Sequence, residues 1–283
     1  MTPRVHEVDV RLKYGDTLHI TPISDAHLDD ALCDFKALQR LAESRRELPN
    51  HHAIWLGDTL NLVVPPDLRR YRPSTQPPEL AGKDDWLNAT IDYVGDRIES
   101  LKLVNDLFIP GNHEDEFCKR YGLDTISILA QRFRAFRGGY SGAIDYRISQ
   151  TDTKRITFRV IYHHGAWGGR LAKGYNSAMP WFSAYDSWNV ALFGHNHASR
   201  VDPETRIRVH DGELEEYEVF VVNCGAWVKS YADDAKVTHY AERHGYARQP
   251  RQCPLIRVTP REIRSGGRHH TKAKLRLDVS VEV

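Results

Sequence analysis

Five short strand-like runs in this chain are each followed by Asp, Asn or His side chains. The runs end near Ser24, Leu56, Pro110, Tyr162 and Phe193. The polar residues that follow them are Asp25 and His27, then Asp58, then Asn112 and His113, then His163 and His164, and finally His195 and His197. Because the strand ends of an α/β sheet converge on one crevice, we expect these side chains to meet. The pattern therefore predicts an α/β fold with a polar site at one edge.

Each of these fragments taken alone has a simpler explanation. Gly111 and Asn112 also suit a turn with positive φ, and Asp25 or Asp29 also suits the N-cap of a following helix. In an extended or gently turning segment, however, residues i and i+2 point the same way, so that Asp25 and His27 can grip one ion. Turn and cap preferences do not explain why five successive strand ends carry the same residue types.

Hydrophobic periodicity and turn residues predict the elements between these sites. The runs Val5 to Lys13 and Thr17 to Ser24 flank the turn Tyr14-Gly15-Asp16 and predict a hairpin at the start of the chain. Helices are predicted from about Leu32 to Leu48, from Trp86 to Val104 and from Glu116 to Phe136, and a Gly-rich loop from Gly165 to about Ser177. Later strands are predicted over 141–149, 155–162, 190–193, 205–209 and 216–222, the last two as a hairpin around Asp211-Gly212, with edge strands over 256–258 and 274–283.

The length of 283 residues suits one large α/β domain, and we predict a single domain over residues 1–283. It carries a long irregular loop over about 64–85, which contains Arg69, Arg70 and Arg72, and a basic extension over about 245–283. The whole chain has a net charge of only +1, whereas the extension has nine Lys/Arg and three Asp/Glu, a local charge of 9 − 3 = +6. These basic segments are either solvated surface or contacts for a polyanion.

Four scattered cysteines favour a reducing compartment over a disulfide framework. The N-terminal residues lack the apolar core of a signal peptide. No run approaches the roughly 20 apolar residues that span a bilayer. We therefore expect a cytoplasmic protein without a membrane partner.

The polar site has the composition of a metal centre. Its oxygen and imidazole ligands, without a thiolate, suit manganese, iron, zinc, cobalt or nickel. Seven candidate ligands are too many for one ion, and they suit two metals that share one bridging carboxylate at a separation of roughly 3.5–4 Å. Such a pair of ions activates water and stabilises an in-line displacement at phosphorus.

The ordered motifs Asp-x-His, Gly-Asp-x-x-Asn, Gly-Asn-His-Glu, His-Gly and Gly-His-x-His span Asp25 to His197. Together they resemble the calcineurin-like metallophosphoesterase superfamily, in a form similar to its phage and bacterial members. The resemblance implies a four-layer α/β/β/α sandwich with two mixed sheets flanked by helices. It also implies a hydrolase of phosphoester bonds with two divalent metal ions, manganese first, with zinc, iron, nickel or cobalt as alternatives. In that mechanism a bridging hydroxide attacks phosphorus.

The resemblance also assigns roles to positions. The implied metal ligands are Asp25, His27 and His197 for the first ion, Asn112, His164 and His195 for the second, and Asp58 as the bridge. We choose His164 over His163 because the family's ligand commonly stands directly before Gly, which leaves His163 beside the ligands. His113 resembles the family's catalytic histidine, which is not a ligand and protonates the leaving oxygen.

Asn61 departs from the family pattern. Three residues after the bridging Asp, some members carry a second Asp that orients the catalytic histidine. Asn61 can accept an imidazole N–H, but it adds no negative charge to hold an imidazolium, and Glu114 or Asp115 are alternative partners for His113. The serine/threonine phosphatases carry Arg-Gly after that Asp, whereas Leu62-Val63 follow here, which argues against that branch.

The substrate is left with alternatives. Arg170 and Lys173 follow the His164 motif and either contact a phosphate or are solvated, while Trp167 and Tyr175 either stack on a base or pack the loop. We expect a phosphodiesterase or nuclease, with nucleic acid as a candidate substrate. The alternative is a phosphomonoesterase or nucleotide phosphatase. A catalytically silent binding module on the same fold is disfavoured because none of the seven candidate ligands is replaced.

Overall fold

Two six-stranded β-sheets face each other in the computed structural model, which describes residues 5–64, 75–167, 174–210, 212–229, 249–265 and 272–282. The first sheet has the order β1 (Val5–Arg11), β6 (Ser141–Ser149), β7 (Arg155–His163), β8 (Val190–Phe193), β10 (Glu213–Cys224) and β9 (Ser199–His210). The second has the order β12 (Lys272–Glu282), β11 (Leu255–Ser265), β2 (Leu18–Ile23), β3 (His51–Trp55), β4 (Asn105–Phe108) and β5 (Phe136–Arg137). Both sheets mix parallel and antiparallel neighbours.

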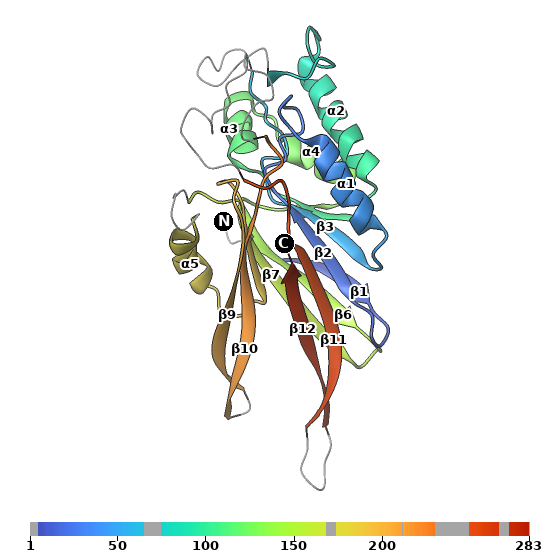
Figure 1. The fold of residues 1–283 in the computed structure, drawn as a ribbon, viewed down its shortest axis with the longest axis vertical. Helices are drawn as coiled ribbons and strands as arrows, with labels where there is room; N and C mark the ends of the chain where they lie inside the picture. Colours follow the sequence, from blue (N-terminus) through green and yellow to red (C-terminus); the bar gives the residue numbers. More distant parts are fainter. Residues whose placement is uncertain are drawn as a thin grey trace.

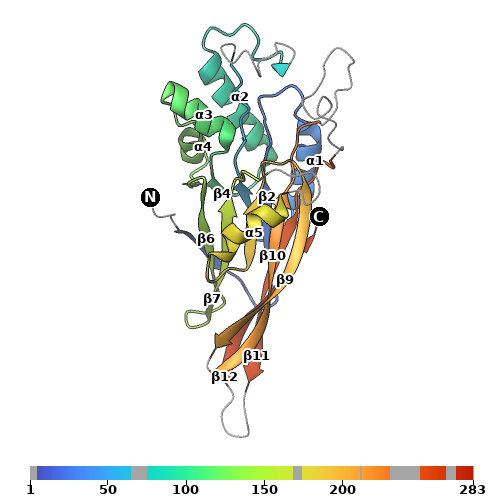
Figure 2. The same ribbon diagram turned by 90° about the vertical axis from the view of Figure 1, so that its left-hand side faces the viewer.

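Helices cover the outer face of each sheet, which gives four layers (Figures 1 and 2). The helices on the second sheet are α1 (Phe35–Arg46), α2 (Trp86–Leu101), α3 (Asn112–Tyr121) and α4 (Thr125–Arg132). On the first sheet, α5 (Tyr175–Ser183) packs Ala178 and Phe182 against the strands. The predicted α/β/β/α sandwich is confirmed.

The strand sequences explain these layers because successive side chains of a strand point to opposite faces. On β3, Ile54 packs between the two sheets, whereas Trp55 packs towards the helices. On β8, Val190 and Leu192 join the core between the sheets, and Phe193 joins the layer under α5. Because both faces of these strands are buried, both sets of side chains are apolar. The strands therefore appear in the sequence as continuous apolar segments and not as an alternating pattern.

The predicted opening hairpin is wrong. β1 pairs in parallel with β6 in the first sheet, whereas β2 pairs with β3 and β11 in the second. Val10 of β1 and Ile20 of β2 lie in the same core between the sheets. The turn therefore carries the chain across the sandwich, because both strands bury an apolar face against the opposite sheet rather than pairing edge to edge.

The predicted helix over 116–136 is two helices, and the first starts earlier than predicted. α3 begins at Asn112 and ends at Tyr121, and the C-cap residue Gly122 has φ +72° and donates its N–H to the Cys118 carbonyl. Asp124 then caps α4 by accepting the N–H of Ser127. A left-handed Gly followed by an Asp N-cap stops one helix and starts another.

Several other boundaries differ from the predictions. α5 begins at Tyr175, inside the predicted Gly-rich loop, and residues 168–173 of that loop lie outside the described residues. In the predicted irregular segment 64–85, residues 65–74 are likewise outside the described residues, and 75–85 contain turns. Ile256 to Val258 of β11 pair with both β2 and β12, so that β12 forms the edge of the second sheet. Among the described residues, no helix combines the length and the apolar character needed to cross a membrane.

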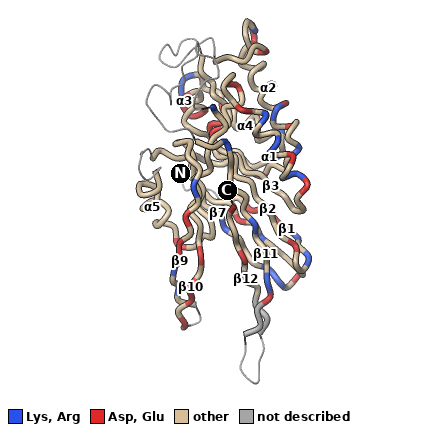
Figure 3. The backbone as a smooth tube through the Cα atoms, in the orientation of Figure 1, with Lys and Arg blue, Asp and Glu red and all other residues tan. Residues whose placement is uncertain are grey.

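Two long hairpins, β9–β10 and β11–β12, extend away from the helices (Figure 1). Their described residues carry charges of both signs, as Figure 3 shows. Arg257 pairs with Glu282, and Arg261 pairs with Asp278 at 2.7 Å. In this part of the C-terminal segment, acidic neighbours thus offset the basic side chains.

The core between the sheets contains a buried polar cluster around Tyr146. Tyr146 Oη donates to Asp106 Oδ2 at 2.8 Å, and His52 Nδ1 lies 2.9 Å from the same oxygen. Tyr146 is fully buried. Burial together with Asp106 raises the pKa of Tyr146 well above its ordinary value, so that the hydroxyl stays a donor.

We predict that Tyr146→Phe lowers the free energy of unfolding by about 1.5–3 kcal/mol, since a bond to a charged acceptor is lost. Urea denaturation measures this change. Tyr162→Phe is the matched control, because the buried Tyr162 hydroxyl has no hydrogen-bond partner among the described residues. Its removal should leave stability unchanged or slightly raised, and equal losses in the two variants would contradict the assignment.

Candidate metal centre

The predicted site residues meet where the ends of the two sheets come together. They follow β2, β3 and β4 in the second sheet and β7 and β8 in the first. The Asp25 N–H donates to the Gly57 carbonyl at 3.1 Å, and the Gly194 N–H donates to the His164 carbonyl at 2.8 Å. The His195 N–H joins the two sheets by donating to Asp25 Oδ2 at 2.9 Å.

The first group consists of Asp25, His27 and His197, each of which offers a ligand atom within 4.8 Å of the others. His197 Nε2 lies 3.3 Å from Asp25 Oδ1. The other Asp25 oxygen accepts from Ser24 Oγ at 2.5 Å. Ser24 and the His195 amide thus hold one carboxylate oxygen, and the second faces the imidazoles.

The second group consists of Asp58, His164 and His195, again with ligand atoms within 4.8 Å of one another. Asn112 Oδ1 lies between the two imidazoles, 3.2 Å from His164 Nε2 and 2.8 Å from His195 Nδ1. His164 Nδ1 donates to the Leu56 carbonyl at 2.7 Å, which leaves its Nε2 for a ligand role. A second partner that fixes one ring nitrogen is typical of metal-binding histidines.

Asp58 lies between the two groups. Its Oδ2 is 3.4 Å from His164 Nε2 in the second group and 3.9 Å from His27 Nε2 in the first. Burial alone would raise the pKa of Asp58, but His164 and His113 hold it well below its ordinary value. The carboxylate is therefore ionised and placed to be shared.

The chemistry of these donors fits divalent metal ions. Both ring nitrogens of His27 and Oδ1 of Asp25 are buried without a hydrogen-bond partner among the described residues. Burial, with a smaller effect of His113, lowers the pKa of His27 to about 3, so that its imidazole is neutral. Burial would also lower the pKa of His164, but Asp58 raises it to about 10. Unpartnered buried polar atoms are costly, and cations satisfy neutral imidazoles and carboxylates together.

The backbone around the site is strained in a way that matches this role. Five of the seven candidate ligands have positive φ: Asp25 (50°), His27 (43°), Asp58 (48°), His195 (71°) and His197 (59°). Such conformations cost on the order of 1–3 kcal/mol each and cluster at functional sites. Asp and His tolerate them better than most residues, and here they turn side chains inwards directly after a strand.

Gly111 is required by close approach rather than by its dihedral angles. A Cβ at this position would collide with Oδ1 and the backbone nitrogen of Asp58. The Gly-Asn-His sequence therefore brings the start of α3 against Asp58, where the His113 N–H donates to Asp58 Oδ1 at 3.0 Å. The motif is thus also a packing requirement.

His113 forms a third close group with His27 and Asp58. Its Nδ1 lies 2.6 Å from the backbone carbonyl of Asn61, and its ring meets the His27 ring edge-on at 4.8 Å. The Asn61 side chain, which we expected as the partner of His113, donates instead to Asp30 Oδ2 at 2.9 Å. Position 61 holds the imidazole through its main chain.

Glu114 and Asp115, the alternative partners, have other contacts. Glu114 is buried and accepts the backbone N–H groups of Gly111, Asp58 and Leu60 at 2.8, 3.1 and 2.9 Å. These bonds connect the loop after β3 to the start of α3. The sequence showed Glu114 as part of the motif but did not predict this structural role. Asp115 pairs with Lys119 at 2.5 Å on the exposed face of α3.

His163 points away from the two groups. Its Nδ1 accepts the Gly165 N–H at 2.8 Å, and its ring packs against Trp167 and Trp181 at 4.6 and 4.8 Å. Burial, and secondarily His164, lowers the pKa of His163 to about 4. Trp167 packs with Phe182 and Phe193, and Tyr175 bonds Glu204. Arg170 and Lys173 lie outside the described residues.

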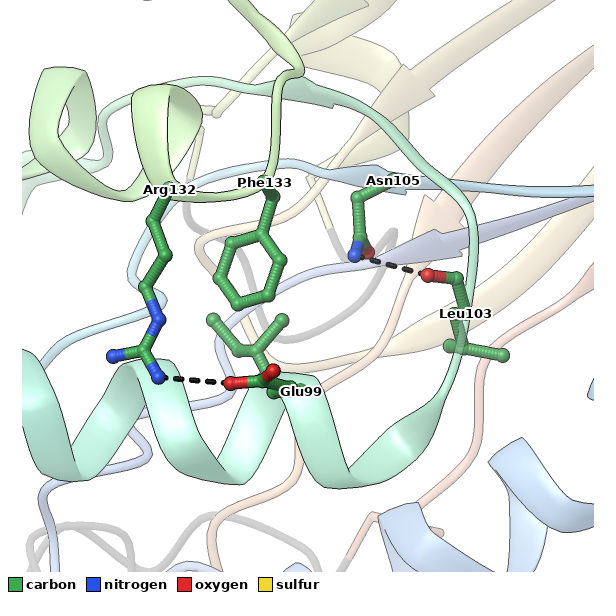
Figure 4. Close-up of a pocket in the computed structure, with 6 residues that line it drawn as sticks. Glu99, Leu103, Asn105, Arg132 and Phe133 are labelled. Atoms are coloured by element: carbon green, nitrogen blue, oxygen red, sulfur yellow. Dashed lines mark hydrogen bonds and ion pairs between the residues drawn. The ribbon is translucent and has the colours of Figure 1, made fainter.

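A shallow surface hollow lies away from these groups. It encloses about 200 Å³ beside α2 and α4 and is lined by Ile98, Glu99, Leu103, Asn105, Arg132 and Phe133. Figure 4 shows Arg132 paired with Glu99 across its wall. Asn105 begins β4, whereas the candidate ligands follow the other end of that strand. The hollow therefore contains none of the chemistry described above.

No family model matches this chain, and no curated protein matches it. One matching solved structure is a conserved uncharacterized protein, a predicted phosphoesterase, from Streptococcus pneumoniae TIGR4; it is 11% identical, covers 92% of this chain and 98% of that chain, and has a TM-score of 0.30. Another is wild-type Vps29 complexed with Zn²⁺ from Entamoeba histolytica, 12% identical, with 93% and 99% coverage and a TM-score of 0.34. At these identities and TM-scores, neither likeness supports a conclusion about the activity of this chain.

We predict that the metal-stripped protein binds two divalent ions, and that Asp58→Ala weakens both because its carboxylate lies between the two groups. His197→Ala should weaken only one. Isothermal titration with Mn²⁺ or Zn²⁺ measures the stoichiometry and both affinities. His163→Phe, which removes the neighbouring imidazole, should keep two ions. Loss of a single ion in Asp58→Ala would show that Asp58 is not shared.

Proposed function

We propose that this protein is a metal-dependent hydrolase of phosphoester bonds of the calcineurin-like metallophosphoesterase type. The observation that carries the proposal is the arrangement of Asp25, His27 and His197 on one side of Asp58 and of His164 and His195 on the other. Two ligand groups around one buried carboxylate suit a pair of divalent ions.

In this proposal the ligands divide between the ions as the family resemblance implies. Asp25, His27 and His197 would hold one ion, Asn112, His164 and His195 the other, and Asp58 both. When bound, such ions activate water as a nucleophile and offset charge that develops on phosphorus oxygens. Manganese is the first candidate, and zinc, iron, nickel and cobalt share the same ligand preferences.

His113 serves as general acid in this proposal. Its Nδ1 is occupied by the Asn61 carbonyl, so that Nε2 is the nitrogen available to the leaving oxygen. Its ring lies against the His27 ring, beside the first group rather than remote from it. A histidine held by one nitrogen with the other free is suited to proton transfer.

We propose phosphodiesters as the preferred substrate class, including nucleic acids. Among the described residues, the charges that act most strongly on Asp25 are those of His197, His164 and Asp58, and those that act most strongly on Asp58 are of His164, His113 and His27, so that none comes from Lys or Arg. A singly charged diester needs fewer additional cations than a doubly charged monoester. The phosphomonoesterase alternative gains support only from Arg170 and Lys173, which lie outside the described residues.

We predict that the metal-stripped protein, refilled with Mn²⁺, Ni²⁺ or Zn²⁺, hydrolyses bis-p-nitrophenyl phosphate faster than p-nitrophenyl phosphate. Release of p-nitrophenolate measures both rates, and the stripped protein is the control. Faster turnover of the monoester would assign a phosphatase. Absence of turnover with two bound ions would favour the binding-module alternative.

We predict that His113→Ala lowers turnover by about 10²–10⁴-fold, the usual contribution of a general acid. Both metal ions should remain bound, because His113 is not assigned as a ligand. Steady-state rates and metal analysis of the same samples test this. A parallel loss of metal and activity would make His113 a ligand instead.

A further inference from the structure

The hydrogen bond that holds His113 comes from a peptide group. Its Nδ1 lies 2.6 Å from the Asn61 carbonyl oxygen. Because a carbonyl oxygen only accepts, Nδ1 must carry the proton. In the neutral ring the hydrogen is therefore on Nδ1, and Nε2 has none. This choice of tautomer depends on the orientation of the Asn61 carbonyl group.

Asp29 grips the other end of the same peptide group. The amide of this group, Leu62 N–H, donates to Asp29 Oδ2 at 2.9 Å, and the preceding Asn61 N–H donates to Oδ1 at 2.5 Å. Asp29 is only 6% exposed. Leu62 has φ +50°, an unfavourable conformation for its side chain that surrounding bonds must maintain. The two oxygens of one buried carboxylate thus bond the amides of two successive peptide groups, and the bond from Leu62 N–H holds the plane of the Asn61–Leu62 group.

We propose that Asp29 is a positioning residue for His113 and acts through the Asn61–Leu62 peptide group. This inference rests on the general-acid role proposed for His113. Hydrogen bonds in a chain polarise one another, so that a carboxylate on the amide side makes the carbonyl a better acceptor for Nδ1–H. No proton moves along this chain. In the proposed step His113 starts with a proton on each ring nitrogen: Nε2 gives its proton to the leaving oxygen, Nδ1 keeps its own, and the ring ends as the neutral Nδ1–H tautomer.

Asp29 thereby supplies a carboxylate at a place where position 61 has only an amide side chain. The carboxylate acts one peptide group away from the imidazole instead of touching it. Both of its oxygens accept backbone amide hydrogens, from Asn61 at 2.5 Å and from Leu62 at 2.9 Å.

Asp30 provides a matched control in the same loop. Its Oδ2 accepts from the side-chain Nδ2 of Asn61 at 2.9 Å, and its Oδ1 accepts the Leu32 N–H at 2.7 Å. In Asp30→Asn, the amide of Asn61 can flip to present its oxygen to the new donor. The backbone amides of Asn61 and Leu62 cannot flip in this way. In Asp29→Asn, the new side-chain NH₂ group therefore faces a backbone N–H, and two donors oppose each other.

The direct test is the tautomer of His113, read from imidazole ¹⁵N spectra of the full chain loaded with diamagnetic Zn²⁺. The His113 signals are assigned by their loss in His113→Gln. The wild type and Asp30→Asn should show His113 protonated at Nδ1, and Asp29→Asn should shift it towards a mixture with the Nε2–H form. An unchanged tautomer in Asp29→Asn overturns the proposal. Asp29→Ser replaces this variant if it does not fold.

Leaving-group dependence provides the functional test. Diphenyl phosphate releases a more basic phenolate than bis-p-nitrophenyl phosphate and therefore depends more on a general acid. Asp29→Asn should lower kcat on diphenyl phosphate about 10-fold more than on the nitrophenyl ester. This is a fraction of the about 10²–10⁴-fold rate enhancement that a general acid contributes. In a His113→Ala background it should not change this ratio further. Equal losses on both esters would mean a purely structural role.

The two tests separate the inference from the function on which it rests. The tautomer is measured without turnover, so that it decides the role of Asp29 even if the wild type hydrolyses neither ester. A wild type without turnover contradicts only the proposed function. Turnover that depends on His113, together with a tautomer that does not depend on Asp29, contradicts only the inference.

Discussion

The carboxylate of Asp25 is the contact on which the rest of the site depends. The backbone N–H of Asp25 donates to the Gly57 carbonyl after β3, and the backbone carbonyl of Asp25 accepts the Trp227 N–H after β10. Its Oδ2 accepts from Ser24 and from the His195 amide after β8. One buried residue thus joins the ends of both sheets.

Burying so many ionisable groups in one place is unfavourable unless they are paired. Asp25, Asp58, Glu114 and His164 are all almost fully buried. Backbone amides satisfy Glu114, and imidazoles face the two aspartates. Neither ring nitrogen of His27 has a hydrogen-bond partner among the described residues. The protein fold supplies most of the compensation, and the remaining unpaired atoms are those that divalent ions would satisfy.

The sequence predicted the strand ends well because two independent signals coincide there. Short continuous apolar runs locate β3, β4 and β8, and the polar residues that follow these strands lie at the same edge of the sandwich. It did not predict that β1 and β2 belong to different sheets, because the turn at Gly15 has the same residues whether it joins neighbours or crosses the core. The break between α3 and α4 was readable at Gly122 and Asp124, but the apolar pattern continued across it.

The contacts around His113 show a second limit of sequence reasoning. A side chain can be read from a position, whereas a backbone carbonyl is present everywhere and gives no signal. Position 61 therefore contacts His113 through its main chain and not through its side chain. The carboxylate that bonds this main chain belongs to Asp29. Glu114 was visible only as part of a motif, and its three amide contacts require the three-dimensional arrangement.

The sheet pairing also has a consequence for biosynthesis. β2, which delivers Asp25 and His27, pairs on one side with β3 and on the other with Ile256 to Val258 of β11. The Trp227 amide that holds Asp25 is also made late. On the ribosome, the first ligands therefore emerge long before their sheet can be completed. The candidate ligands can therefore reach the arrangement described here only after β11 and the residues around Trp227 have emerged.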